Sequence, residues 1–158
     1  MGVTMIPLRR FTARALPIDD QGRVLLLNGF DPAHPDEPYW FTIGGAIEGG
    51  ETLQHAAARE LFEEVGIRAG VEDLLGPYGT STIEFSFAEY AVTQDQTFFA
   101  VRVGEVEVSF DHMDQVEKDT TIGHRWWTAE ELDATEDVVF PEDLPAILRK
   151  IRMDAGRG

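Results

Sequence analysis

The feature that most constrains this chain is a glycine-rich segment that leads directly into a helix-forming one. Residues 44–50 contain four glycines in seven positions, which predicts a backbone that bends tightly or approaches another group closely. Thr52 follows as a helix N-cap, residues 53–65 have the pattern of a regular helix, and Gly66 is a typical left-handed helix end. We therefore expect a tight backbone segment to deliver the chain into a well-capped helix.

The expected helix presents three carboxylates on one side. At 100° per residue, Glu60, Glu63 and Glu64 fall within an arc of about 100°. The adjoining arc, which we expect to pack on the core, consists of Ala57, Ala58, Leu61, Phe62 and Val65. Like charges at these spacings destabilise a helix, so either the face is solvated or a cation offsets the repulsion. Clustered oxygen donors suit Mg²⁺ or Mn²⁺, and because Mg²⁺ often also binds phosphate oxygens, the second alternative predicts a phosphate-containing substrate.

Strands and short helices are expected around this helix. The segments rich in apolar, aromatic and β-branched residues predict strands at 11–18, 23–27, 39–43, 81–92, 97–103 and 124–127. Three prolines in residues 31–38 predict an irregular loop. Thr128 with Glu131 predicts a capping box for a short helix, and Pro141 is expected at the first position of a last, amphipathic helix. Strands before, between and after helices favour an α/β or α+β arrangement with a mixed sheet.

The composition limits the class of protein. A length of 158 residues predicts one domain, and 43% hydrophobic residues are sufficient for one core. A net charge of −16 argues against long nucleic acid or an anionic membrane as a partner. The absence of cysteine excludes disulfides and thiolate zinc sites and favours the cytoplasm. Neither a signal-peptide pattern nor an apolar run of membrane-spanning length is visible. We expect a monomer or a homodimer.

Together, the glycine-rich segment and the helix resemble the box of the Nudix hydrolases at every fixed position. The matching residues are Gly45, Glu51, Arg59, Glu60, Leu61, Glu63, Glu64, Gly66 and Ile67. Residues 40–45 are similar to the strand that enters the box, and residues 124–127 resemble a late strand of bacterial members, so the resemblance covers about residues 9–148. It implies an α/β/α sandwich with a mixed β-sheet between helices. The expected organisation is a single Nudix hydrolase domain over 1–158, with its core at about 9–153.

The resemblance also implies an activity, the Mg²⁺-dependent hydrolysis of a nucleoside diphosphate linked to another moiety, with Mn²⁺ as an alternative ion. Carried over by position, Glu60, Glu63 and Glu64 look like metal ligands, joined by the carbonyl oxygen of Gly45. Divalent ions are physically reasonable here, because they would neutralise a diphosphate beside an acidic patch and lower the pKa of bound water. Water would attack phosphorus, and a carboxylate such as Glu63 would accept the proton. The expected partner is a small nucleoside diphosphate derivative.

Three more positions complete the site that the resemblance implies. Glu51 and Arg59 are similar to the pair that steadies the loop and helix in this family. A further acid from a later loop often binds metal or serves as base in Nudix hydrolases. Glu117 has the matching position, with Asp114 and Asp111 as rivals. Glu117 is accordingly the second candidate for the proton acceptor.

An alternative is a non-catalytic Nudix-fold module that binds nucleotide-like effectors. Its usual mark is the loss of box carboxylates, and none is lost here. The isomerase branch of the fold requires a catalytic cysteine, which this sequence lacks. Ile43 replaces the proline that commonly precedes the paired glycines, and residues 81–85 carry none of the familiar subfamily markers. The identity of the substrate therefore stays open.

Two groups of residues outside the box have both a functional and a structural interpretation. Arg9, Arg10 and Arg14 either grip a phosphate or are solvated charges. Trp126 and Trp127 point to opposite faces of the expected strand, so at most one packs in the core while the other stacks on a base or packs under a helix. The four histidines lack zinc-type spacing and are expected to be ordinary surface or sheet residues.

Overall fold

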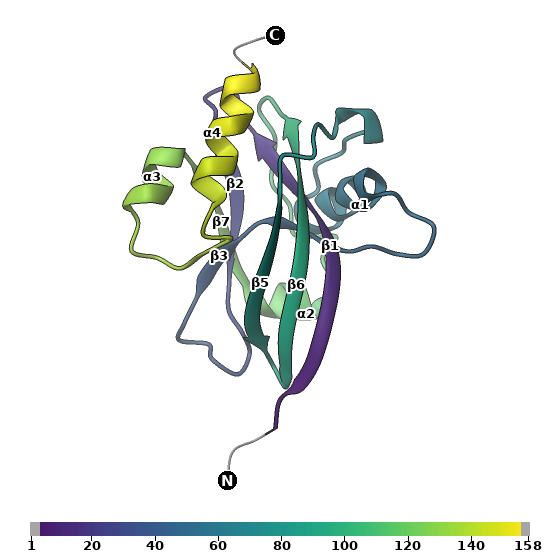
Figure 1. Cartoon of the computed structure of the whole chain (residues 1–158), viewed down its shortest axis with the longest axis vertical. Helices are drawn as coiled ribbons and strands as arrows, with labels where there is room; N and C mark the ends of the chain where they lie inside the picture. The colour runs from purple at the N-terminus through teal and green to yellow at the C-terminus, as the bar shows by residue number, and fades with distance from the viewer. Residues whose placement is uncertain (1–3, 156–158) are drawn as a thin grey trace.

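Two hydrophobic clusters on opposite faces of a mixed β-sheet form the core. Figure 1 shows helices on both sides of this sheet. The structure is a computed structural model that describes residues 4–155. Its strands are β1 (Ile6–Ile18), β2 (Val24–Gly29), β3 (Tyr39–Phe41), β4 (Ile43–Ala46), β5 (Thr80–Phe87), β6 (Tyr90–Arg102), β7 (Thr121–Trp127) and β8 (Val139–Phe140). Its helices are α1 (Leu53–Val65), α2 (Gln115–Thr120), α3 (Ala129–Ala134) and α4 (Leu144–Ala155), with a 3₁₀ turn η1 (Val71–Asp73). Helices on both faces of a mixed sheet confirm the predicted fold class.

The sheet divides into two wings that meet near the β1–β2 turn. β1 pairs with β6 in parallel over its whole length, from Ile6↔Tyr90 to Ile18↔Arg102, and β5 and β4 complete the first wing. The second wing consists of β7, β2, β3 and β8. The register between β1 and β2 contains the single pair Ile18↔Val24. Beyond this pair β1 and β2 are not paired, so the two wings of the sheet separate from each other.

The alternation of side chains along β1 explains the layers. Ala15 packs with α1 in one hydrophobic cluster, whereas Leu16 and Ile18 pack with α3 and α4 in the other. The same alternation separates the two tryptophans. Trp127 is buried in the second cluster and Trp126 packs at the side of the first, so one of the two is a core residue, as the sequence predicts.

The caps of α1 are those that the sequence predicts. The Thr52 side chain accepts a hydrogen bond from the His55 N–H, and Gly66 ends the helix in the left-handed conformation with φ 74°. Thr128 and Glu131 likewise form the predicted capping box of α3. Such signals are readable from sequence because each cap involves residues only a few positions apart.

The expected single strand at 39–43 is wrong. The chain changes its neighbour at Thr42, so that β3 pairs with β2 while β4 pairs with β1. Arg14 donates hydrogen bonds to both the hydroxyl and the carbonyl oxygen of Thr42, which stabilises this change of partner. Gly44 and Gly45 consequently lie in a strand and not in a loop.

The expected turn between strands at 81–92 and 97–103 is also wrong. The chain turns at Ala88, which has φ 52°, and β6 begins at Tyr90. Residues 93–96 continue the ladder with β5. These residues are polar, but one face of this part of β6 is exterior and the other borders a cavity. Both faces therefore accept polar residues.

The start of the last helix differs as well. Pro141 is not its first residue, because the Pro141 carbonyl accepts a turn hydrogen bond from Leu144, where α4 begins. β1 starts at Ile6 and not at residue 11. The sequence does not predict α2, η1 or β8, since each is too short to show a period. Within residues 4–155, the helices fall short of the length and apolarity that crossing a bilayer would need.

Candidate active site

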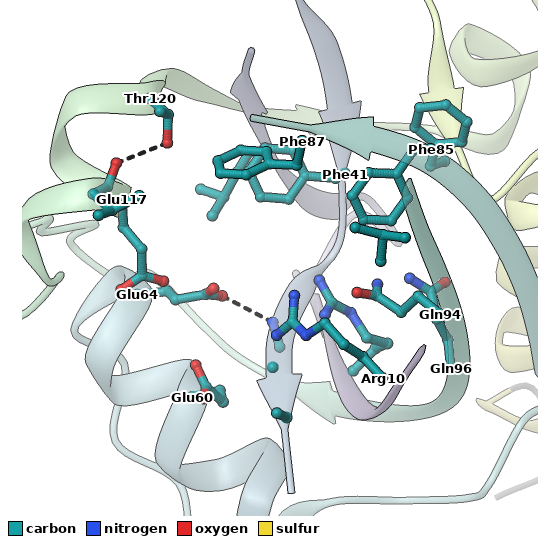
Figure 2. A pocket seen from close by; sticks show the side chains of 18 of the residues that line it. Arg10, Phe41, Glu60, Glu64, Phe85, Phe87, Gln94, Gln96, Glu117 and Thr120 are labelled. Carbon is teal, nitrogen blue, oxygen red and sulfur yellow. Dashed lines mark hydrogen bonds between the residues drawn. The ribbon is translucent and has the colours of Figure 1, made fainter. Parts of the chain in front are cut away.

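Three carboxylates from two helices meet at one point. Glu60 and Glu64 lie one turn apart on α1, Glu117 lies on α2, and oxygen atoms of all three are within 4.8 Å of one another. Figure 2 shows the three side chains on the same side of a cavity. We call these three residues the acidic cluster. Several hard oxygen donors that face one position fit Mg²⁺ or Mn²⁺.

Without a cation the acidic cluster is electrostatically unfavourable. Burial raises the pKa of Glu60, against the opposing effect of Arg59, and burial also raises the pKa of Glu117. The pKa of Glu64 lies well above its ordinary value because of burial, which the charge of Arg14 opposes in part. The three carboxylates thus hold protons more tightly than free side chains do. A divalent cation would reverse this effect, because it favours the ionised form of its ligands.

β4 lies directly against the acidic cluster, and this approach requires glycine. The Gly44 N–H donates to Glu64 Oε2 at 2.8 Å. Gly44 has φ 149°, and a Cβ there would lie 2.8 Å from the Arg14 Cα and closer still to a backbone oxygen of β1. A Cβ at Gly45 would lie 2.5 Å from Glu60 Oε1. The absence of both side chains therefore lets a strand and two carboxylates occupy adjoining space.

Arg59 joins the helix to the segment that precedes it. Its Nε and Nη2 donate to the Glu51 oxygens at 2.8 and 2.9 Å, and its Nη1 donates to Glu60 and Glu63 at 2.8 and 3.1 Å. Nη2 also reaches the Ala46 carbonyl at 3.1 Å. The guanidinium lowers the pKa of Glu51 to about 2, so the pair is ionised at neutral pH. This forked, charge-assisted contact holds residues 46–51 on the helix.

A cavity of about 490 Å³ extends from the acidic cluster into the space between the two wings. Its aromatic lining residues are Phe30, Tyr39, Phe41, Phe85, Phe87, Tyr90 and Phe140. Figure 2 shows Phe41, Phe85 and Phe87 away from the carboxylates, with Gln94, Gln96 and Arg10 along the wall of β6 and β1. One end of the cavity suits a phosphate chain with its cation, and the other suits a flat, apolar group.

Comparison with known proteins assigns this architecture to a family. The model of the NUDIX domain matches residues 8–147. The chain belongs to the Nudix family. A MutT-like protein of Streptomyces ambofaciens is 33% identical over 79 residues, and the match covers 50% of this chain and 48% of that protein. The chain therefore spans about half the length of this curated relative.

Solved structures share the Nudix fold at low sequence identity. The E. coli dihydroneopterin triphosphate pyrophosphohydrolase superposes with a TM-score of 0.64 at 21% identity, covering 94% of this chain and 99% of its own. A C. elegans Ap4A hydrolase gives a TM-score of 0.60 at 19% identity, with the same coverage of 94% and 99%. The MutT protein of Methanosarcina mazei gives 0.57 at 21% identity, covering 95% and 96%. These likenesses support the fold.

The residues of the Nudix box lie at different places relative to the acidic cluster. Glu60 and Glu64 belong to the cluster, and Gly45 lies against Glu60. Glu63 lines the same cavity but lies outside the cluster, with 43% of its side chain exposed and one oxygen bound to Arg59. The structure thus brings together two of the three box carboxylates that the resemblance implies as ligands.

Of the three later acids considered from sequence, Glu117 is the one in the acidic cluster. Asp114 is the N-cap of α2, where its side chain accepts from the Glu117 N–H at 2.8 Å and its own N–H donates to Glu117 Oε1 at 3.1 Å. Asp111 is exposed and is not among the described residues that line the cavity. Asp114 therefore holds Glu117 in place through these two hydrogen bonds, and Glu117 is the residue that belongs to the acidic cluster.

The three N-terminal arginines have different surroundings. Arg9 pairs with Asp95 at 2.8 Å on the outer face of the first wing. Arg14 is buried against Thr42, and burial lowers its pKa to about 10. Arg10 lines the cavity (Figure 2). Arg10 is thus the one of the three that faces the ligand space without being bound to Thr42 or to Asp95.

Our sequence interpretation missed the aromatic lining and the two glutamines. A signal was present, because residues 83, 85 and 87 and residues 90, 92, 94 and 96 alternate along two neighbouring strands. The register of β5 with β6 places both sets on one face. With the turn misplaced by several residues, the two sets could not be aligned from the sequence.

Proposed function

We propose that this Nudix chain is a Mg²⁺-dependent pyrophosphohydrolase that cleaves a nucleoside diphosphate linked to another moiety by attack of water on phosphorus. The acidic cluster at one end of a cavity whose other end is aromatic carries this proposal. A phosphate chain with its cation suits the first end, and a nucleoside suits the second. Two structural neighbours, a dihydroneopterin triphosphate pyrophosphohydrolase and an Ap4A hydrolase, are named for cleaving the same class of bond, a phosphoric anhydride, which supports the proposal.

The acidic cluster would hold the cation, and Gly45, which lies against Glu60, would supply its carbonyl oxygen as a further ligand. Mg²⁺, or Mn²⁺ in its place, would neutralise phosphate charge and lower the pKa of water. Glu63 stands at the edge of the same cavity, held by Arg59. Either Glu63 or Glu117 accepts the proton of the attacking water.

The proposed partner is a small molecule. A cavity of about 490 Å³ suits a nucleotide derivative, and a net charge of −16 disfavours long nucleic acid. We place the protein in the cytoplasm on the basis of its lack of cysteine.

A screen of nucleoside triphosphates, nucleotide sugars, ADP-ribose and dinucleoside polyphosphates with Mg²⁺, followed by mass spectrometry, tests the proposal. At least one class should be converted to a nucleoside monophosphate. Glu64→Gln should lower kcat by about 100-fold or more, because it removes a ligand. Glu72→Gln, at an exposed position of η1, should leave kcat unchanged. Nucleotide binding without turnover of any class would favour the binding module instead.

The Glu63→Gln variant separates the roles proposed for Glu63. A fall in kcat with unchanged Mg²⁺ affinity would identify Glu63 as the proton acceptor, whereas a fall in both would identify it as a ligand. The Mg²⁺ dependence of the rate and a calorimetric Mg²⁺ titration give the two quantities. A kcat near that of the wild type would eliminate both roles.

A further inference from the structure

We propose that Gln96, with Gln94 beside it, determines which substrate the site accepts by hydrogen-bonding the edge of a planar nitrogen heterocycle. The proposal rests on the proposed hydrolase function for the phosphate end of the ligand, and it concerns the β6 wall of the cavity, where both glutamines lie. It assigns a specificity-determining role to two residues outside the Nudix box.

Gln96 carries a buried amide with an unused acceptor. The residue is 3% exposed, and among the described residues its Oε1 has no hydrogen-bond partner. It lines the cavity, and Figure 2 shows it on the wall next to Gln94. A buried acceptor without a partner is unfavourable. A ligand whose binding turns this oxygen toward the cavity, and which donates a hydrogen bond to it, would remove the penalty.

The strand register explains why two glutamines share this wall. Gln94 and Gln96 are two residues apart on β6, so their side chains lie on the same face of the strand. Gln94 is also buried and lines the cavity. The neighbours on that face, Val92 and Phe98, are apolar and buried. Since apolar side chains are accommodated on either side of the pair, packing alone does not call for amides here, and a ligand gives a reason for them.

Flat aromatic rings from both wings border the same cavity. The ring centroids of Phe85 and Phe140 are 6.4 Å apart, those of Phe140 and Tyr39 are 5.5 Å apart, and those of Tyr39 and Phe41 are 5.7 Å apart. Burial raises the pKa of Tyr39 to about 12, so its hydroxyl is neutral. Such surroundings favour a flat, uncharged ring in contact with the aromatic side chains.

The chemistry of a carboxamide narrows the class of ring. Its acceptor oxygen and donor nitrogen lie side by side in one plane. They match an N–H group next to a ring nitrogen or a carbonyl oxygen, as in the pairing of glutamine with the edge of adenine. A sugar can bind the amides through its hydroxyls, but it offers the aromatic rings only C–H groups and not a flat π face. The amides and the rings together therefore point to a nucleobase or a related heterocycle.

Calorimetric binding of non-hydrolysable nucleotides tests this proposal independently of turnover. The probes are the α,β-methylene analogues of ATP, GTP, CTP and UTP with Mg²⁺, and tripolyphosphate is the probe that lacks a ring. We expect one analogue to bind more tightly than tripolyphosphate, and Gln96→Leu to weaken that analogue on the order of tenfold. Gln21→Leu, at an exposed turn position, is the matched control. Gln96→Met replaces the leucine variant if the latter does not fold.

A ring analogue that lacks the N–H donor gives the decisive comparison, for example purine riboside in place of adenosine. Removing the donor should weaken binding to the wild type on the order of tenfold and should change binding to Gln96→Leu little, because the partner is already absent. Equal losses in both proteins, or no effect of Gln96→Leu, would overturn the proposal. If the ring donor and Gln96 depend on each other in this way but no nucleotide is hydrolysed, heterocycle recognition is supported and the hydrolase function is contradicted. If a nucleotide is hydrolysed but the two losses are independent, the hydrolase function is supported and heterocycle recognition by Gln96 is contradicted.

Discussion

Gly44 is the residue at which backbone conformation and chemistry depend most directly on each other. Its N–H donates to Glu64, and its φ of 149° is one that residues with a side chain rarely adopt. The glycine spacing was readable from sequence because it is local. The role of Gln96 was not, since it depends on strand register and on a cavity formed by distant segments.

We expect Gly44→Ala to destabilise the fold by about 2–4 kcal/mol, because the added Cβ would strain φ and collide with the backbone of β1. Urea unfolding measures this change. Gly49→Ala is the control, since a Cβ there would meet no described atom within 4 Å, and its effect should stay within about 0.5 kcal/mol. If Gly44→Ala lowered the free energy of unfolding no more than Gly49→Ala does, the close approach of β4 to β1 would be unimportant for stability.

At the scale of elements, Asp31 joins the loop after β2 to the tip of the β5–β6 hairpin. Asp31 is 4% exposed, and its carboxylate accepts hydrogen bonds from the Ser86 hydroxyl at 3.1 Å and from the Ala88 N–H at 2.7 Å. Because Ala88 is the turn of the hairpin, this contact connects the two wings at the far end of the cavity.

Asp31→Ala should destabilise the protein by about 2 kcal/mol, since buried donors lose a charged acceptor. Hydrogen exchange should increase in residues 80–92 while α1 keeps its protection. Asp36→Ala, at an exposed position of the same loop, is the control. Unchanged exchange in the hairpin would mean that the contact does not hold the two wings together.

The elements also show where sequence interpretation succeeds and where it stops. α1 was predictable, because its N-cap, its acidic face and its terminal glycine lie within one continuous segment. The contact between the loop and the hairpin was not predictable, because Asp31 is separated from Ser86 by 55 positions and from Ala88 by 57 positions in the sequence. α2 carries Glu117 but has only six residues, too few to show a helical period.

The whole molecule carries a net charge of −16. Burial of the acidic cluster makes the stability of the folded state depend on pH. The pKa of Glu64 is raised, so the folded state keeps this proton to a higher pH than the unfolded chain does. That contribution to stability is present below the ordinary pKa of 4.5 and is lost as pH rises through the raised pKa. Glu51, with its pKa lowered to about 2, has the opposite effect, but only below pH 4.5.

Cation-free protein should therefore melt at a lower temperature at pH 8 than at pH 6. Saturating Mg²⁺ should raise the melting temperature by about 5 °C or more at pH 8 and by less at pH 5, because protons compete for the same carboxylates. Calorimetry in NaCl of matched ionic strength separates this effect from general screening. Glu64→Gln should reduce the difference between the Mg²⁺-induced rise in melting temperature at pH 8 and that at pH 5. An equal rise at pH 8 and at pH 5 in the wild type would contradict the prediction.

The change of strand partner at Thr42 also sets a length. Phe41, on the aromatic side, and Gly45, against Glu60, are four positions apart in the chain, and an extended backbone spans at most about 14 Å over that distance. The distance between the parts of the cavity proposed for the ring and for the phosphates is thus limited by a short piece of covalent chain and not by the packing of one wing on the other. A molecule with a longer spacer between its ring and its phosphates would therefore place only one of these groups in its part of the cavity.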